Sequence, residues 1–291
     1  MRAYPTRWTA SPFHYLETSG ATSVRSRVAV GRDGKYRFPI LEDLAKRGLT
    51  DYVAALTRFG AETIIGQVDS IYSSWATDDP AGFTDDQVAA LEALLPSFAL
   101  AIRATSMRDI AGTLVETYLG RDAGKRVLSG TIGRGDAEHL TSVLWMSDLK
   151  GFTRIVDSVD PALIMPLLND YADAIVTAIH AHGGQVLKFI GDGVLATFGA
   201  DDPAKGTALA LDAVQDAFAR AAEINVRRAA AKLPVSEPYV ALHVGEVFYG
   251  NFGAIDRLDF TVVGPAVNEL ARISGMSRSL DQDVVISSAF A

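Results

Sequence analysis

The second half of the chain alternates between strand-like and helix-like segments in an order that few folds accommodate. Apolar and β-branched runs mark the strands, two helix-like segments start with an Asp-Pro pair, and the first of them ends at two glycines. The first six segments follow the β-α-β-β-α-β order of the ferredoxin-like split unit, so we predict an α+β fold. In chain order, the segments are residues 141–145, 160–182, 185–190, 194–198, 202–232, 239–244, 260–263, 265–273 and 284–287.

Composition and charge exclude several classes of protein. The chain contains no cysteine, which excludes disulfides and thiolate metal centres, and its net charge of -8 disfavours a nucleic-acid partner. No uninterrupted apolar run approaches the roughly 18 residues of a membrane span. The N-terminus also lacks the apolar stretch of a signal peptide. We therefore expect a cytoplasmic protein with neither a membrane segment nor a nucleic-acid partner.

The front of the chain predicts a smaller α+β domain. Strand-like runs occur at residues 62–68 and 70–75. A helix start follows at Thr84, which is placed to form a capping box with Gln87. Apolar residues then recur at helical spacing, and Pro96 predicts a kink or a restart within this helix.

A helical connector joins the two halves. Its apolar residues, Met107, Ile110, Leu114 and Tyr118, recur at helical spacing before a series of glycines breaks the pattern. This stripe packs either on its own domain or against a second copy of the chain, and the sequence leaves both options open. We expect a front domain at residues 1–105, the connector at 106–138 and a back domain at 139–291.

Two aspartates in the back domain are candidates for a metal site. Asp148 follows the first strand, and Asp192 lies at the tip of the hairpin, 44 residues later. Since the first strand and the hairpin are neighbours in a split unit, both carboxylates can reach one point, where they suit Mg²⁺ and leave positions for water and phosphate. Alone, Asp148 is equally well explained as a cap on the next turn and Asp192 as a turn residue, but the pair favours the metal site. Amides after Gly151 can approach phosphate oxygens.

A second cluster lies on the last helix. Asn268 and Arg272 are four residues apart and share one helix face. A guanidinium beside an amide suits a phosphoryl group and a sugar oxygen, although a solvated helix face has the same spacing. Lys188 lies on the strand that enters the hairpin, where a lysine more often extends to the edge of the sheet than to a ligand.

These residues and their surroundings resemble the class III nucleotidyl cyclases, the adenylate and guanylate cyclase catalytic domain. The resemblance rests on several motifs that occur in order and at the family's spacing. They are WMSDLKGFT at 145–153, LLNDYADAIVTAIHAHGGQVLKFIGDGVLATFG at 167–199, LHVGEVFYGNFG at 242–253 and RLDFTVVGPAVNELARI at 257–273. The front domain loosely resembles the GAF sensor domains, through strands followed by an amphipathic helix.

The resemblance implies an adenylate cyclase, a lyase that converts ATP to 3′,5′-cyclic AMP and pyrophosphate. It implies that Asp148 and Asp192 bind two Mg²⁺ or Mn²⁺ ions per site, and that Asn268 and Arg272 stabilise the transition state. In the guanylate-forming branch a glutamate usually stands in place of Lys188. The residues expected to contact the substrate are Lys188 and Thr261 at the base, with Gly151, Phe152 and Thr153 at the phosphates.

In this family the site lies between two catalytic domains. One chain that carries both residue sets therefore implies a homodimer, formed through the catalytic domain and the connector helix. Two features depart from the family's pattern. Pro166 predicts a kink in the first catalytic helix, and the chain stops at Ala291, before strands in which the family usually has a triphosphate-binding lysine. Two alternatives to an adenylate cyclase therefore stay open: a catalytically impaired nucleotide-binding regulatory module and a guanylate cyclase.

Overall fold

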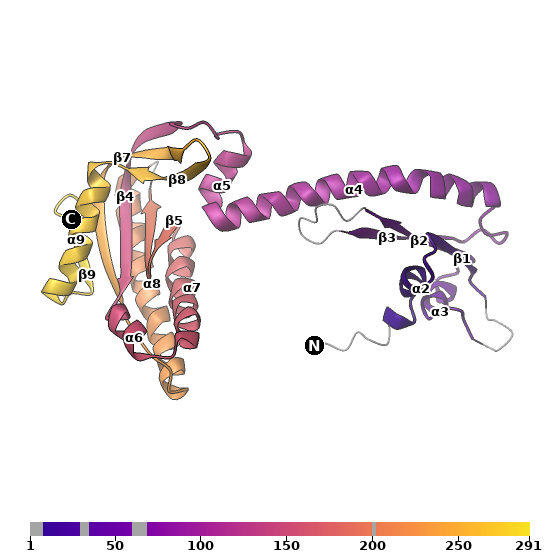
Figure 1. The fold of residues 1–291 in the computed structure, drawn as a ribbon, viewed down its shortest axis with the longest axis horizontal. Helices are drawn as coiled ribbons and strands as arrows, with labels where there is room; N and C mark the ends of the chain where they lie inside the picture. Colours follow the sequence, from indigo (N-terminus) through magenta and orange to yellow (C-terminus); the bar gives the residue numbers. More distant parts are fainter. Residues whose placement is uncertain (1–7, 30–34, 60–68, 200–201) are drawn as a thin grey trace. The chain divides into compact units, whose positions relative to one another are not determined.

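The computed structural model describes residues 8–29, 35–59, 69–199 and 202–291. The chain divides into two compact units, Met1–Ala111 and Gly112–Ala291 (Figure 1). Each unit has hydrophobic clusters of its own. The strand expected at 62–68 lies outside the described residues.

The front unit has an antiparallel sheet of three strands. Its elements are α2 (Pro12–Ser19), β1 (Ser23–Arg27), α3 (Ile40–Lys46), β2 (Asp51–Arg58) and β3 (Ser70–Thr77). The strands lie in the order β1–β2–β3, and both helices contribute to a core that includes Leu16, Leu41 and Leu56. The strand expected at 70–75 therefore forms most of β3. The α+β character of this unit agrees with the sequence, while its relation to GAF domains stays a prediction.

Helix α4 (Asp85–Leu119) begins at the predicted capping box. The Thr84 N–H donates to Gln87 Oε1 at 2.8 Å, and the Gln87 N–H donates to Thr84 Oγ1 at 3.2 Å. Of the kink or restart expected at Pro96, the restart does not occur, because α4 continues through this residue as one helix. A proline φ is compatible with a helix, and the helix loses one backbone hydrogen bond there.

Two described helices are long and apolar enough to cross a membrane. These are α4 and the helical stretch Pro161–Ala181. Length and composition alone are a weak indication, because a core helix of a soluble protein passes the same test. The second stretch behaves as such a core helix, since Leu167, Tyr171 and Ile175 are buried in the back unit. The absence of a membrane segment therefore stays a prediction.

The back unit has a six-stranded mixed sheet. Its strands are β4 (Ala137–Leu149), β5 (Gln185–Ile190), β6 (Gly193–Phe198), β7 (Pro238–Ala254), β8 (Arg257–Val263) and β9 (Val284–Ile286). They lie in the order β5-β6-β4-β7-β8, and β9 pairs with β7 in parallel. Every strand expected in this half is present. However, β7 extends well beyond the expected 239–244, because the glycines at 245, 250 and 253 interrupt its sequence pattern without ending the strand.

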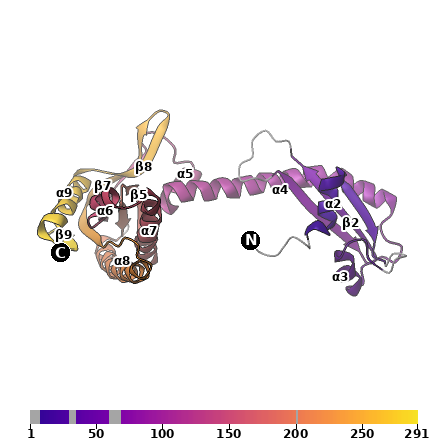
Figure 2. The ribbon, with the colours of Figure 1, turned by 60° about the horizontal axis from the view of Figure 1, so that its bottom comes forward.

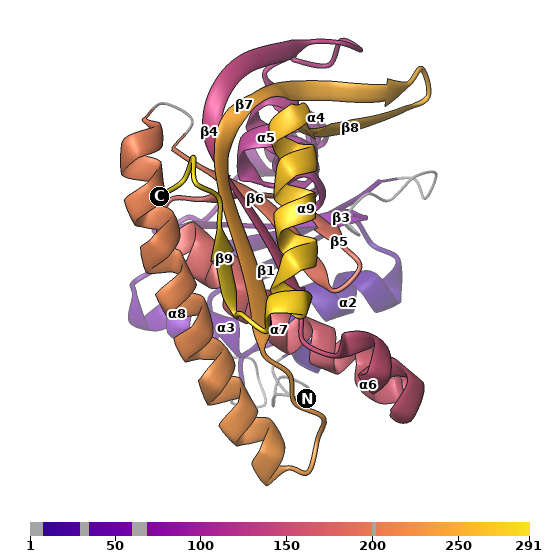
Figure 3. The same ribbon diagram turned by 90° about the vertical axis from the view of Figure 1, so that its left-hand side faces the viewer.

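Helices cover both faces of this sheet. They are α5 (Arg121–Leu128), α6 (Phe152–Ser158), α7 (Ile164–Ala181), α8 (Pro203–Ala230) and α9 (Pro265–Leu280). Helices α7 and α8 pack on one face around Trp145, while α5 and α9 pack on the other around Leu144 (Figure 3). Ala123 of α5 is buried in the second cluster, so this part of the predicted connector belongs to the back unit's core.

Two predicted helix features need correction. Pro166 lies in the first turn of α7, which begins at Ile164. Backbone N–H groups in a first turn have no acceptor within the helix, so this proline costs no helical bond and the predicted kink is wrong. Asp160 caps a short 3-10 turn that precedes α7. The last helix was expected to end near residue 273, but α9 runs to Leu280.

The ends of β7 and β8 form a hairpin that projects from the back unit (Figure 2). Its strands pair from Phe248 and Val263 at the base to Ala254 and Arg257 at the tip. Apolar side chains stand exposed along it, including Phe248, Phe252, Ile255 and Leu258. Such a concentration of exposed apolar side chains is typical of an interaction surface.

Candidate active site

The strand order places the two candidate carboxylates side by side. Asp148 is the penultimate residue of β4, and Asp192 lies in the turn between β5 and β6. The turn rests against the end of β4, where Ser147 pairs with Val194. Gly193 permits this approach, because a Cβ atom there would lie 2.2 Å from the Ser147 carbonyl oxygen. The expected meeting of the first strand and the hairpin is therefore found.

One backbone donor joins the two carboxylates. The Leu149 N–H donates to Asp148 Oδ1 at 3.0 Å and to Asp192 Oδ2 at 3.1 Å. Burial, together with the neighbouring Asp148 carboxyl, raises the pKa of Asp192 to about 6. Burial also raises the pKa of Asp148, but hydrogen bonds from Asp192 and Arg278 outweigh it and lower that pKa below its usual value. The pair is thus arranged to share a proton or to bind a cation.

This donor set fits a hard divalent cation. Two half-buried carboxylates supply the oxygen ligands that Mg²⁺ and Mn²⁺ prefer, and they leave positions for water and phosphate. Across the described residues, no group of three or more His, Asp or Glu side chains is gathered as a metal site. A cation on Asp148 and Asp192 would therefore complete its coordination with ligands from outside these side chains.

Arg278 is a residue of this site that sequence reasoning missed. Its guanidinium forms an ion pair with the Asp148 carboxylate, although 64% of the Arg278 side chain is exposed. The expected helix ended near residue 273, which placed Arg278 outside any element. The longer helix α9 carries it to the edge of the carboxylate pair.

The other predicted pair does not join the carboxylates. Asn268 and Arg272 are both exposed on α9, on the shared face that their spacing predicts. Among the described residues, no hydrogen bond or ion pair connects either side chain to Asp148 or Asp192. One chain therefore presents two separate groups of candidate residues.

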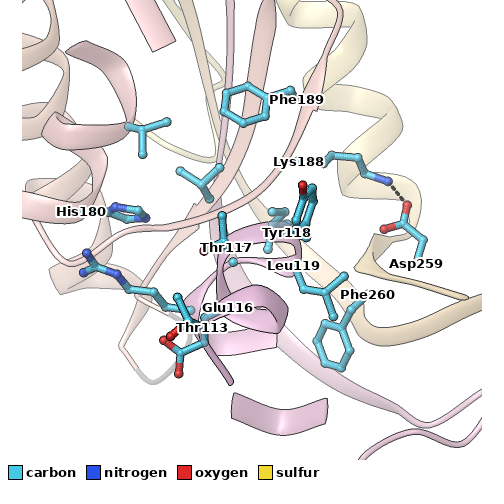
Figure 4. A pocket seen from close by; sticks show the side chains of 15 residues that line it. Thr113, Glu116, Thr117, Tyr118, Leu119, His180, Lys188, Phe189, Asp259 and Phe260 are labelled. Atoms are coloured by element: carbon cyan, nitrogen blue, oxygen red, sulfur yellow. Dashed lines mark hydrogen bonds and ion pairs between the residues drawn. The ribbon is translucent and has the colours of Figure 1, made fainter. Parts of the chain in front are cut away.

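Lys188 lies against the opposite edge of the sheet. Its Nζ donates to Asp259 Oδ2 at 2.6 Å, although β5 and β8 are the two ends of the strand order (Figure 4). The hydrophobic core supports this meeting, because Leu187 and Phe260 share a cluster with Ala123 of α5. Asp259 was missed because its partner lies 71 residues away in the chain.

A cavity of about 660 Å³ opens beside this ion pair (Figure 4). Its walls come from α5, α7, β5, β8 and the end of α4, and include Tyr118, His180 and Phe189. Thr261 lies two residues from Asp259 on β8. It is buried, and its hydroxyl has no hydrogen-bond partner within the described part of the chain. The expected base-reading residues therefore lie on two strands whose edges converge.

The predicted phosphate-contacting residues follow the carboxylate pair directly. Gly151 has a φ of 66°, in the left-handed region that favours glycine, and α6 begins at Phe152. Gly151 and Thr153 are exposed and Phe152 is partly buried. Contact between these residues and a phosphate stays a prediction.

The split sheet carries a carboxylate pair at the end of its first strand, and such a pair suits a hard divalent cation. Residues 137–289 match the sequence model of the adenylate and guanylate cyclase catalytic domain. This match covers more than half of the chain, so the chain belongs to that family of nucleotidyl cyclases.

Relatives of similar sequence occur in mycobacteria. The uncharacterized proteins Rv1319c and Rv1320c of Mycobacterium tuberculosis are 30% and 32% identical over 178 residues, which is 60% of this chain. The match covers 32% and 30% of their lengths, so the chain spans about a third of these relatives. A bacterial light-regulated adenylyl cyclase has the same fold, with a TM-score of 0.58 and 22% identity over 68% of this chain and 56% of that one.

Proposed function

We propose that the protein is an adenylate cyclase that converts ATP to 3′,5′-cyclic AMP and pyrophosphate. The observation that carries the proposal is the Leu149 N–H shared by Asp148 and Asp192, because carboxylates held this closely suit the divalent ions that accompany a triphosphate. In this reaction the ribose 3′-oxygen bonds to the α-phosphorus, the 3′-hydroxyl gives up its proton, and pyrophosphate leaves.

The residues at the phosphates divide into two roles. Asp148 and Asp192 would hold Mg²⁺ or Mn²⁺, two ions per site. When bound, these ions lower the pKa of the 3′-hydroxyl and offset charge on the leaving pyrophosphate. Arg272 would offset charge on the α-phosphoryl oxygens, and Asn268 would hold the ribose. A preorganised group of this kind contributes roughly 10²- to 10³-fold in rate.

The proposed preference for ATP rests on Lys188 of β5 and Thr261 of β8, the strands at the two ends of the sheet order. Lys188 donates hydrogen bonds only, which suits the adenine N1, and Thr261 offers a buried hydroxyl that can bond the exocyclic edge. Asp259 holds the Lys188 ammonium, so it would set the direction from which Lys188 approaches the base. A carboxylate in place of Lys188 would instead suit guanine.

A homodimer would unite the two groups of residues. Asp148 and Asp192 of one chain would act with Asn268 and Arg272 of its partner, since these pairs do not meet within one chain. The exposed apolar side chains of the β7–β8 hairpin supply a surface for this contact. Leu114 and Tyr118 are likewise exposed on the part of α4 that lies in the connector, which supports a second contact there.

The front unit is proposed to be a GAF-like regulatory domain. Its sheet and helices form a core separate from that of the cyclase unit, and α4 follows the sheet in the chain and continues past Ala111 into the cyclase unit. A change in the dimer geometry of α4 would then alter how the two catalytic domains meet. We place the enzyme in the cytoplasm, where ATP is available and a chain without cysteine needs no oxidising compartment.

Product analysis tests the proposed function. The purified chain is incubated with Mn²⁺ and either ATP or GTP, and cyclic nucleotides are separated and identified by mass. Cyclic AMP at the higher kcat/KM is expected. Preferential formation of cyclic GMP would identify a guanylate cyclase, and nucleotide binding with no cyclic product from either substrate would identify a regulatory module.

A further inference from the structure

The Leu149 N–H, which donates to both carboxylates, is followed in the chain by Lys150, whose backbone and side chain are both bonded to other segments. The side chain of Leu149 is buried, and its N–H lies between the two carboxylates. A rotation of the peptide plane between Asp148 and Leu149 would move this N–H away from one carboxylate or the other, and residue 150 anchors the backbone directly after Leu149. The spacing of the pair therefore depends on what holds residue 150.

Lys150 is held on both its backbone and its side chain. Its N–H donates to the Glu237 carbonyl at 2.8 Å, and its own carbonyl accepts from Ser236 Oγ at 2.9 Å. Its Nζ donates to Glu237 Oε2 at 3.0 Å, forms an ion pair with Asp283, and lies 5.1 Å from the ring centroid of Tyr239. Only 24% of the side chain is exposed.

These contacts tie three separate segments together. Lys150 follows β4, Glu237 precedes β7, and Asp283 lies between α9 and β9. The Asp283 carbonyl also accepts from the Val240 N–H at 2.8 Å, so this residue is itself anchored to β7. A single ammonium thus separates two carboxylates that would otherwise repel each other. No local pattern in the sequence indicates that Lys150 bridges these two carboxylates.

We propose that Lys150 is a positioning residue of the metal site, which holds the Leu149 N–H between Asp148 and Asp192 through its bonds to Glu237 and Asp283. The inference rests on the proposed function of the two aspartates as metal ligands. Residues that orient the ligands of a metal typically change its affinity by about 10- to 100-fold when they are replaced. Lys150 itself touches neither carboxylate and is not a catalytic residue.

Direct binding of Mn²⁺ tests the proposal without reference to turnover. Free Mn²⁺ is titrated by electron paramagnetic resonance against the full chain, and Lys150→Met is expected to weaken binding about tenfold. Lys150→Arg keeps the charge and is expected to stay within about threefold of the wild type. Lys46→Met is the matched control, because Lys46 also bridges two carboxylates, Glu42 and Asp43, but in the front unit.

The dependence of turnover on Mn²⁺ concentration is a second measurement, which distinguishes a poorly spaced metal site from an unfolded protein. Excess Mn²⁺ is expected to restore the activity of Lys150→Met, because the ligands are present but poorly spaced. If Lys150→Met does not fold, the double variant Glu237→Gln, Asp283→Asn leaves Lys150 in place without its anchors and is expected to weaken Mn²⁺ binding similarly.

Four results test this inference and the proposed function separately. Wild-type Mn²⁺ affinity in Lys150→Met, or in the folded double variant, would overturn the positioning role, and so would an equal loss in Lys46→Met. A loss of affinity that Lys150→Arg does not repair would also count against it. If Asp148→Ala and Asp192→Ala bind Mn²⁺ as well as the wild type, the metal assignment itself fails.

Discussion

Lys188 on β5 donates a hydrogen bond to Asp259 on β8, across 2.6 Å, although these strands are the two ends of the sheet order. The sheet must curl for its ends to meet, and the cluster of Leu187, Phe260 and Ala123 fills the space between them. The curl brings the proposed base-reading residues together. Their relation to each other is therefore a property of the whole sheet.

Replacing Lys188 should change the preference for the base. Lys188→Met removes a charged donor, and a hydrogen bond to a charged group contributes about 1.5–3 kcal/mol. The expected result is a fall in kcat/KM for ATP of about 10- to 100-fold, with a much smaller change for GTP. Steady-state kinetics with both nucleotides measure the effect, with Lys205→Met as a control on α8. An unchanged ATP-to-GTP ratio would show that Lys188 does not read the base.

The aspartate pair should be required for turnover and dispensable for folding. Asp148→Ala and Asp192→Ala each remove a ligand, and metal-ion catalysis is worth several kcal/mol, so kcat should fall by about 10³-fold or more. Circular dichroism checks the fold, and the exposed Asp157→Ala serves as the control. Substantial activity in either purified variant would contradict the metal assignment.

Two inactive variants should restore activity when they are combined in one dimer. Asp148→Ala and Arg272→Ala damage different halves of a site that two chains share. A mixed dimer contains one site with both defects and one intact site. Random pairing makes about half of the dimers mixed, so co-expression should return roughly a quarter of wild-type activity. Absence of recovery in dimers shown to be mixed would place each complete site within one chain.

The raised pKa of Asp192 predicts a pH effect on the stability of the metal-free protein. The folded pKa of about 6 lies above the usual 3.8, so the folded state binds the proton more tightly than the unfolded state does. This contribution is fully present below pH 4 and is lost as the pH rises through 6. Asp192→Asn removes it, so the variant should gain stability relative to the wild type between pH 4 and 7.

The gain should be about 1 kcal/mol, once solvent screening of a partly exposed carboxyl is allowed for. Thermal unfolding of both proteins in a chelating buffer measures the difference at each pH. A difference that stays constant from pH 4 to 7 would show that Asp192 is not protonated preferentially in the folded state. Added Mn²⁺ should stabilise the wild type more than the variant, since only the wild type retains both carboxylates.

Local chemistry in the sequence was sufficient for the order of the main elements of the back unit. It did not predict α2, α3, β1 and β2 of the front unit, or the full lengths of β4 and β7. Helix starts were predictable because a cap acts within three residues, as Thr84 does with Gln87 and Asp202 does with the Lys205 N–H. The end of α9 was not predictable in this way. Its last turns contain serines and a glycine, which are weak helix formers, and the buried Ser277 shows that tertiary packing sustains the helix there.

The sequence by itself determined the strand and helix order, and that order placed Asp148 near Asp192, because neighbouring strands of a split unit have few alternative arrangements. Only the tertiary structure decided the contacts of Arg278, Asp259 and Lys150. Each depends on partners from distant segments, and a one-residue bulge in β5 between Val186 and Lys188 shifts its register against β6. The periodicity of a single segment cannot predict such contacts or register shifts, because the curl of the sheet and the packing of the helices decide them.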